Sequence, residues 1–157
     1  MLKRSFIISL GIALLVLAPL AASAAPKPQV KGPITITSET LTADNKAHTA
    51  LFEKNVVAKT PNMTLYADSM LVFYTEKGGN VTKIEATGNV RLYKDTRVIT
   101  SQKATYFADQ DKVVFTGGPR AVDGENVVTG TTMTYFIAED RSYVEHGKVI
   151  LKNGGVR

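Results

Sequence analysis

The chain has 157 residues, 19 basic and 14 acidic side chains, and no cysteine. This length fits one domain with a real core, and the lack of cysteine excludes a fold stabilised by disulfides. The weak basic excess, which falls to 17 against 14 without Lys3 and Arg4, does not indicate a nucleic-acid partner.

Residues 1–24 have the features of a Sec-type signal peptide. Lys3 and Arg4 precede an apolar run over residues 6–17, Pro19 interrupts it, and small residues up to Ala24 form a cleavage site. The apolar run is shorter than the ~20 residues of a membrane-spanning helix. We therefore expect cleavage after Ala24, or after Ala25. Residues 25–32 contain two prolines and form a flexible leader, and residues 33–157 form the domain.

The domain repeats one pattern four times. Equivalent apolar residues occur at Ile36, Leu65, Ile99 and Val128, with spacings of 29, 34 and 29 residues. Each unit alternates apolar and polar positions and contains a turn rich in Asp and Asn, which favour tight turns. These four turns are expected at Asp44–Lys46, Glu76–Asn80, Asp109–Asp111 and Glu139–Arg141.

A second turn in each unit carries glycine. Gly88, Gly117 and Gly147 occupy it in three units, whereas the first unit has Lys54. Glycine here predicts a positive φ or a bulge that lets one short strand bend into the next. We expect strands of ~4 to 6 residues and an all-β fold, because no segment shows a helical period.

One parity of the alternation is apolar throughout, which predicts a buried face. A stack of similar units makes a trough with two open ends, and an aliphatic and aromatic lining suits acyl chains. The alternative is a closed core filled by side chains. The predicted lipid-binding positions are Ile34, Ile36, Leu41, Phe52, Val56, Leu65, Met70, Val72, Ile84, Val90, Leu92, Ile99, Tyr106, Val113, Phe115, Val128, Met133, Tyr135, Val149 and Leu151.

Catalytic and metal sites are poorly supported. His48 and His146 occupy different places in their units, so we expect surface histidines. Asp109–Asp111 lacks the glycine and distal glutamate of a calcium loop. The acids fall mostly in turns, whereas glycoside hydrolysis needs two acids that converge in a cleft. We expect no cofactor, no metal and no enzymatic activity.

Three stretches resemble the LptA/OstA-like lipopolysaccharide-transport family. They are Gly32–Ile36 followed by Asp44, Met63–Asp68 followed by Val72 and Tyr74, and Ala86–Val90. The resemblance implies an open, twisted β-jellyroll of stacked antiparallel strands in the periplasm. Its interior would receive the acyl chains of lipopolysaccharide. Glu53-Lys54-Asn55 departs from the usual Gly-Asn step of the family in the first unit.

The resemblance also implies edge-to-edge joining with an inner-membrane LptC-like protein and an outer-membrane LptD-like protein, and a possible head-to-tail homo-oligomer. A stack leaves its first and last strands unpaired, and such edges recruit other strands. The predicted partner edges are Ile34, Thr35, Ile36 and Thr37, and Lys148, Val149, Ile150 and Leu151. The alternatives are an LptC-like subunit, a secreted structural β-repeat protein with a solid core, and a glycan-active enzyme.

Overall fold

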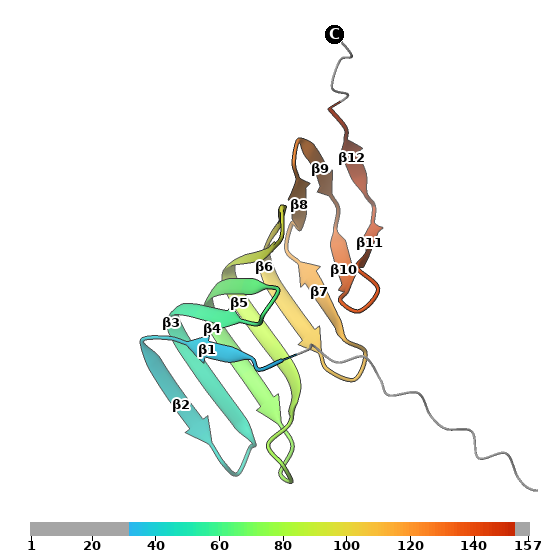
Figure 1. The fold of residues 1–157 in the computed structure, drawn as a ribbon. Coiled ribbons are helices and arrows are strands. Elements are labelled where there is room, and N and C mark those ends of the chain that lie inside the picture. Colours follow the sequence, from blue (N-terminus) through green and yellow to red (C-terminus); the bar gives the residue numbers. More distant parts are fainter. Residues whose placement is uncertain (1–31, 153–157) are drawn as a thin grey trace, which may run out of the picture.

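The computed structural model describes residues 32–152, which form twelve β-strands and no helix (Figure 1). The expected signal peptide and the leader up to residue 31 lie outside the described residues. Within residues 32–152, no helix is present that would be able to cross a membrane. The strands are β1 (Thr35–Thr37), β2 (Thr40–Asp44), β3 (Thr49–Lys59), β4 (Thr64–Tyr74), β5 (Val81–Lys94), β6 (Arg97–Phe107), β7 (Lys112–Thr116), β8 (Arg120–Asp123), β9 (Asn126–Thr129), β10 (Thr132–Phe136), β11 (Arg141–Glu145) and β12 (Lys148–Ile150).

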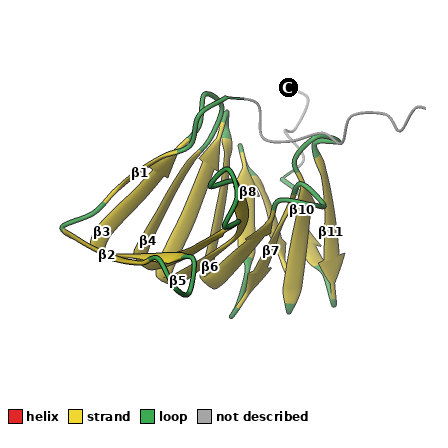
Figure 2. Ribbon diagram, turned by 90° about the horizontal axis from the view of Figure 1, so that it is seen from below, coloured by secondary structure: helices red, strands yellow, loops and turns green. Residues whose placement is uncertain are grey.

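All twelve strands belong to one antiparallel sheet that bends into two layers. The upper layer has the order β1–β3–β4–β5–β6–β8–β9–β12, and the lower layer has the order β2–β3–β4–β5–β6–β7–β10–β11. Strands β3 to β6 therefore run through both layers. Figure 2 shows these four strands side by side, followed in the sheet by the shorter strands β7, β10 and β11. The predicted all-β, open antiparallel architecture is confirmed.

Bulges create the bend in the long strands. In β5 the bulge contains Gly88 at φ 80° and Asn89 at φ 48°, and the pairing with β6 shifts between Thr87 and Val90. In β3, Lys54 and Asn55 occupy the same place with φ of 65° and 51°. The predicted backbone role of Gly88 is confirmed. The predicted strand length is wrong for β3 to β6, which have 11 to 14 residues, because a bulge bends a strand without ending its ladder.

The C-terminal half bends differently. Strands β7 to β11 have four or five residues each, as predicted, and β12 has three. Gly117 and Gly118, with φ of 76° and 71°, separate lower strand β7 from upper strand β8. Gly130 and Gly147 lie at the corresponding breaks after β9 and before β12. Here each layer is made of separate strands.

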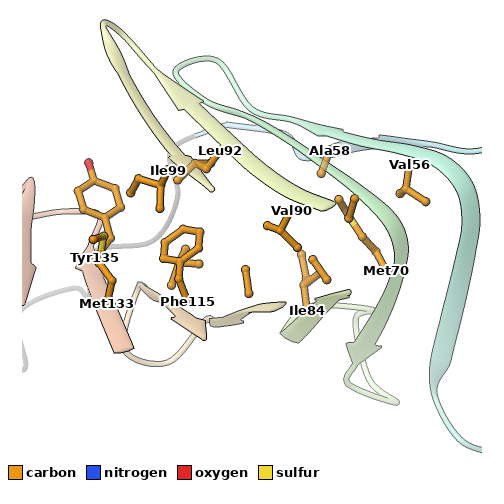
Figure 3. Packing of buried hydrophobic residues seen from close by; sticks show 14 of the residues in the cluster. Val56, Ala58, Met70, Ile84, Val90, Leu92, Ile99, Phe115, Met133 and Tyr135 are labelled. Carbon is orange, nitrogen blue, oxygen red and sulfur yellow. The ribbon is translucent and has the colours of Figure 1, made fainter. Parts of the chain in front are cut away.

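The core fills the space between the layers. Side chains alternate along each strand, so every second residue points from one layer toward the other, and Figure 3 shows these residues facing one another. The largest fully buried side chains include Tyr135, Phe115, Met70 and Ile99. The inward faces of the two layers thus form one continuous apolar cluster.

The outward face of the lower layer carries an alternating aromatic and cationic row. Adjacent strands pair Phe73 with Lys83, Lys83 with Phe107, and so on across six strands. Lys83 lies 4.1 Å from the centroid of the Phe73 ring. We call this row the aromatic–cation ladder, and it comprises Phe73, Lys83, Phe107, Lys112, Phe136 and Arg141.

Each end of the stack presents two unpaired strand edges. Among the strands of residues 32–152, β1 and β2 both pair only with β3, β12 pairs only with β9, and β11 pairs only with β10. The predicted partner edges fall on β1 and β12, with Ile34 and Leu151 just outside these strands. Sequence reasoning missed the longer edges of β2 and β11. Their use by partners stays a prediction.

Candidate functional site

The candidate site is the groove between the two layers. Its middle part is narrow and apolar. A cavity of about 70 Å³ there is lined by Leu65 and Leu92 from the upper layer and by Ile84 and Tyr106 from the lower layer. Thr60 and Met63, in the turn between β3 and β4, also line it. This volume is about that of two water molecules, so side chains fill most of the middle groove.

Toward β11 and β12 the groove widens and becomes partly polar. A second cavity of about 440 Å³ has an apolar part that includes Val128 from the upper layer and Met133 and Val144 from the lower layer. Its polar lining includes Arg97, Asp123, Asn126, Asp140 and Ser142. The groove therefore combines an apolar middle with a wider end that holds charged side chains.

Five polar side chains at this end form what we call the Asp140 network, and three of them, Arg97, Asp123 and Asp140, line the cavity. The Tyr135 hydroxyl donates a hydrogen bond of 2.7 Å to Asp140 Oδ1. Lys94 Nζ and Arg97 approach the same oxygen at 3.3 and 3.2 Å, and Arg97 lies 3.6 Å from Asp123. Lys94, Arg97 and Asp123 belong to the upper layer, whereas Tyr135 and Asp140 belong to the lower layer. The network thus joins the two layers at the wide end of the groove.

The electrostatics of the network favour its charged form. The hydrogen bond from Tyr135 and the charges of Lys94 and Arg97 lower the pKa of Asp140, although burial opposes this shift. Burial and the bond to Asp140 raise the pKa of Tyr135. For Lys94, burial alone would lower the pKa, but hydrogen bonds with Tyr135 and Asp140 outweigh it and raise the pKa. Asp140 is therefore ionised and Lys94 protonated near neutral pH.

This arrangement disfavours the glycan-active enzyme. Asp123 and Asp140 do line one cavity, but Arg97 lies between them and contacts both. A general acid needs a raised pKa, whereas that of Asp140 is lowered. Within residues 32–152, no group of three His, Asp or Glu side chains is placed to hold a metal ion. His48 packs edge-on against Tyr74 and His146 contacts Thr131, at opposite ends of the chain's strand order.

Most predicted lipid-binding positions do point into the groove. The buried ones are Val56, Met70, Val72, Ile84, Val90, Leu92, Ile99, Val113, Phe115, Met133 and Tyr135, and the half-buried ones are Ile34, Ile36, Phe52, Leu65, Tyr106 and Val128.

Three predicted positions are exposed instead. Leu41, Val149 and Leu151 have exposed fractions of 58, 55 and 66%. Leu41 pairs with Phe52 and Val149 with Val128, so both have the inward parity. Leu41 and Val149 are exposed because they lie on β2 and β12, which no further strand of residues 32–152 covers.

Sequence reasoning missed the Asp140 network. Lys94 and Arg97 continue the inward parity of Leu92 and Ile99 across the β5–β6 hairpin, which was a usable signal. Asp140 was assigned only a turn role, and it does occupy the β10–β11 turn with φ 47°. Its position within the groove depends on how the two layers face each other, which the repeat pattern does not specify.

Comparison with known proteins agrees with this geometry. A family model described as "LptA/(LptD N-terminal domain) LPS transport protein" matches residues 35–141. The LPS-assembly protein LptD of Coxiella burnetii is 30% identical over 80 residues, which are 51% of this chain and 9% of that protein. The chain thus spans about a tenth of that relative's length.

A solved structure shows the same fold. It is the crystal structure of LptH from Pseudomonas aeruginosa, described as the LptA homologous periplasmic component of a lipopolysaccharide transport device. The TM-score is 0.71 at 13% sequence identity, and the match covers 80% of this chain and 99% of LptH.

Proposed function

The chain belongs to the family of LptA and LptD N-terminal domains, which are lipopolysaccharide transport proteins, and from that premise we propose that its groove shields lipopolysaccharide acyl chains in the periplasm. The observation that carries the proposal is the continuous apolar face shared by both layers. Each methylene transferred from water to such a face gains ~0.8 kcal/mol. The expected signal peptide agrees with a periplasmic location.

The groove must widen to receive an acyl chain. The middle cavity of about 70 Å³ is too small for one, whereas the cavity at the C-terminal end has about 440 Å³. The breaks between β7 and β8, β9 and β10, and β11 and β12 leave the layers of this end without continuous strands between them. We therefore place lipid entry or exit at this end, followed by separation of the layers in the middle.

Photo-crosslinking at adjacent residues tests the groove. Tyr106 lines the middle cavity, whereas its neighbour Thr105 has the opposite parity and points outward. Phe52 and Glu53 form a second such pair near the N-terminal end. We expect a photoreactive residue at position 106 or 52 to capture lipopolysaccharide and one at 105 or 53 to capture little. Neither pair lies on the outward face of the upper layer.

The matched pairs make the result interpretable. The two members of a pair differ by one residue in position and by the layer face that they occupy. Equal capture by inward and outward members would contradict the proposal. Absence of capture at all four positions would instead support the structural protein with a solid core.

We further propose that the strand edges join this chain to other members of the pathway. An unpaired edge recruits another strand through main-chain hydrogen bonds, and both ends of the stack offer two such edges. The partners proposed are an LptC-like inner-membrane protein, an LptD-like outer-membrane protein and a second copy of this chain. Joining at the ends would align the grooves of successive proteins.

Proline scanning of β11 tests this bridging. Successive amides of an edge strand point alternately to its neighbour and to the free side, and proline removes the amide donor. Ser142 and Tyr143 are successive residues, so only one of their amides points to the free side. Proline at that residue should weaken the pull-down of partners and leave the melting temperature unchanged. Proline at the other residue should lower the melting temperature. The same pairing applies to Thr35→Pro and Ile36→Pro in β1. Folded variants that all bind partners like the wild type would contradict edge-to-edge joining.

A further inference from the structure

The outward face of the upper layer carries more basic than acidic side chains. Residues 32–152 contain 14 basic and 14 acidic residues, so this part of the chain is balanced overall. Lys59, Arg91, Arg120 and Lys148 nevertheless all occupy outward strand positions of the upper layer. Within residues 32–152, Asp68 of β4 is the one acidic residue among these outward strand positions; it lies at the bend and accepts a hydrogen bond of 2.9 Å from Asn89 Nδ2.

Three of these residues form a row across the strands. Arg91 pairs with Thr100, Thr100 with Arg120, and the row continues through Thr129 to Lys148. Every second strand thus contributes one positive charge. Because neighbouring strands lie 4.7–4.9 Å apart, the charges are spaced by about 10 Å along the row. The positive charge is spread along the sheet.

An apolar row runs directly beside the basic one. Its members are successive cross-strand partners, with the Tyr93 and Ile150 side chains 40 and 52% exposed at its two ends. Tyr66 packs edge-on against Tyr93 with 5.6 Å between ring centroids, and Arg91 lies over the Tyr66 ring. The apolar row consists of Tyr93, Val98, Val122, Val127 and Ile150.

The basic residues lack ion-pair partners among the described residues. None of Lys59, Arg91, Arg120 and Lys148 forms a salt bridge within residues 32–152, and all four are exposed. At the margin of the face, Asp68 accepts a hydrogen bond from Asn89. In the hairpin turns, Asp95 contacts Lys94 and Glu125 contacts Lys152. By contrast, Lys83 on the lower layer pairs with Glu85. The positive charge of the upper face is therefore available to a partner.

We propose that the outward face of the upper layer binds the surface of an anionic lipid bilayer. Basic residues near such a surface are attracted by its negative potential, and adjacent aromatic and aliphatic side chains enter the interfacial region. The remaining outward side chains are mainly threonines. The Asp68 carboxylate and the Asn89 and Gln102 amides lie at the bend, where they line a surface cavity with Arg91 and Thr100. A diffuse negative layer needs no directional partner, whereas an acidic protein would. This function uses the face opposite to the groove.

Vesicle flotation tests the proposal. We expect the exported protein to float with phosphatidylglycerol vesicles and not with phosphatidylcholine vesicles at low salt. The face variant is Lys59→Gln/Arg91→Gln/Arg120→Gln, which avoids the groove and the edge strands. The control variant is Lys46→Gln/Lys77→Gln/Lys103→Gln, which removes the same charge from turns and from the lower layer. The face variant should bind roughly 100-fold more weakly, from the usual contribution of each basic residue, and the control less than threefold more weakly.

The outcomes separate the alternatives. Wild-type protein that binds neither vesicle would overturn the proposal and leave a soluble acidic protein as the occupant. Equal losses in the face and control variants would also overturn it, because net charge alone would then explain binding. Circular dichroism checks that each variant is folded. All proteins begin at the same residue, so that they differ only in the substituted side chains. Lipopolysaccharide capture at Tyr106 should persist in the face variant, so a failure here is distinct from a failure of the groove proposal.

Discussion

The N-terminal and C-terminal halves of the groove share the inward alternation of apolar residues but differ at the bend. In the N-terminal half, four strands of 11 to 14 residues pass from one layer into the other, with bulges in β3 and β5. In the C-terminal half, each crossing from one layer to the other is a break, where one short strand ends and another begins. The cavity of about 70 Å³ in the middle of the groove is lined mainly by the continuous strands, whereas the cavity of about 440 Å³ is lined mainly by the short ones. Continuous strands accompany closely packed layers, whereas broken strands accompany a wider space.

The bulge at Gly88 gives the largest expected effect. A Cβ atom at Gly88 would overlap the Asp68 side chain, and the residue has φ of 80°. Gly88→Val should therefore lower the stability by about 3 kcal/mol, from combined strain and overlap. The melting temperature should fall by roughly 10–20 °C, measurable by circular dichroism.

The matched control is Gly118→Val in the C-terminal half. Gly118 has a similar φ of 71°, but its Cβ would meet no atom within 4 Å. This variant should cost only the strain of the left-handed conformation, about 1–2 kcal/mol. Equal destabilisation by the two variants would show that the bulge and the break are equivalent, contrary to the comparison.

The bulge in β3 should be improvable. Lys54 has φ of 65° without being glycine, and a long side chain is disfavoured in that conformation. Lys54→Gly should raise the stability by up to about 1 kcal/mol, detected as a shift in the urea midpoint. Asn55→Gly should change it less, because asparagine tolerates φ > 0. A lower midpoint for Lys54→Gly would mean that its side chain, not its backbone, matters at the bend.

The Asp140 network should affect the opening of the wide end more than the global stability. Asp140→Asn removes the ionic contacts with Lys94 and Arg97, which for exposed pairs are worth at most about 1 kcal/mol. We expect a broader or longer distance distribution between spin labels at residues 125 and 138, in the two layers. The chain has no native cysteine, so both labels can be placed through introduced cysteines.

The pH dependence of that distance has a definite sign. The pKa of Asp140 in the folded protein is below its ordinary value of 3.8. The contribution of the network is therefore complete above the ordinary value and is lost as the pH falls through the lowered one. Wild-type protein at such acidic pH should approach the distances of Asp140→Asn. Identical distances in both proteins at neutral pH would rule out a role of the network in holding the layers.

The sequence was informative where local chemistry decides the structure. The Asp- and Asn-rich turns, the inward parity and the positive φ of Gly88 all follow from side-chain preferences that act over a few residues. It was less informative at the bend itself, because Lys54 and Asn55 form a bulge without glycine. Such a bulge leaves the alternation on both sides intact, so the pattern does not show whether a strand continues.

Other features depend on the assembled layers. The alternation of apolar and polar residues correctly assigned Leu41 to the inward face. Its exposure could not be predicted, because it depends on β2 being at the end of the described sheet. Likewise, the turn chemistry of Asp140 was evident, but its contact with Arg97 brings together residues 43 positions apart. The candidate groove was therefore predictable as a surface, whereas its width and its polar end were not.

The aromatic–cation ladder has a consequence for how such chains change length during evolution. Each of the hairpins β4–β5, β6–β7 and β10–β11 supplies one ring and one cation: Phe73 with Lys83, Phe107 with Lys112, and Phe136 with Arg141. Duplication or deletion of a whole hairpin would leave every ring beside a cation, whereas loss of a single strand would place like beside like. The unit that can be copied is thus the hairpin, because the alternation of rings and cations within the ladder is kept only when strands are gained or lost in pairs.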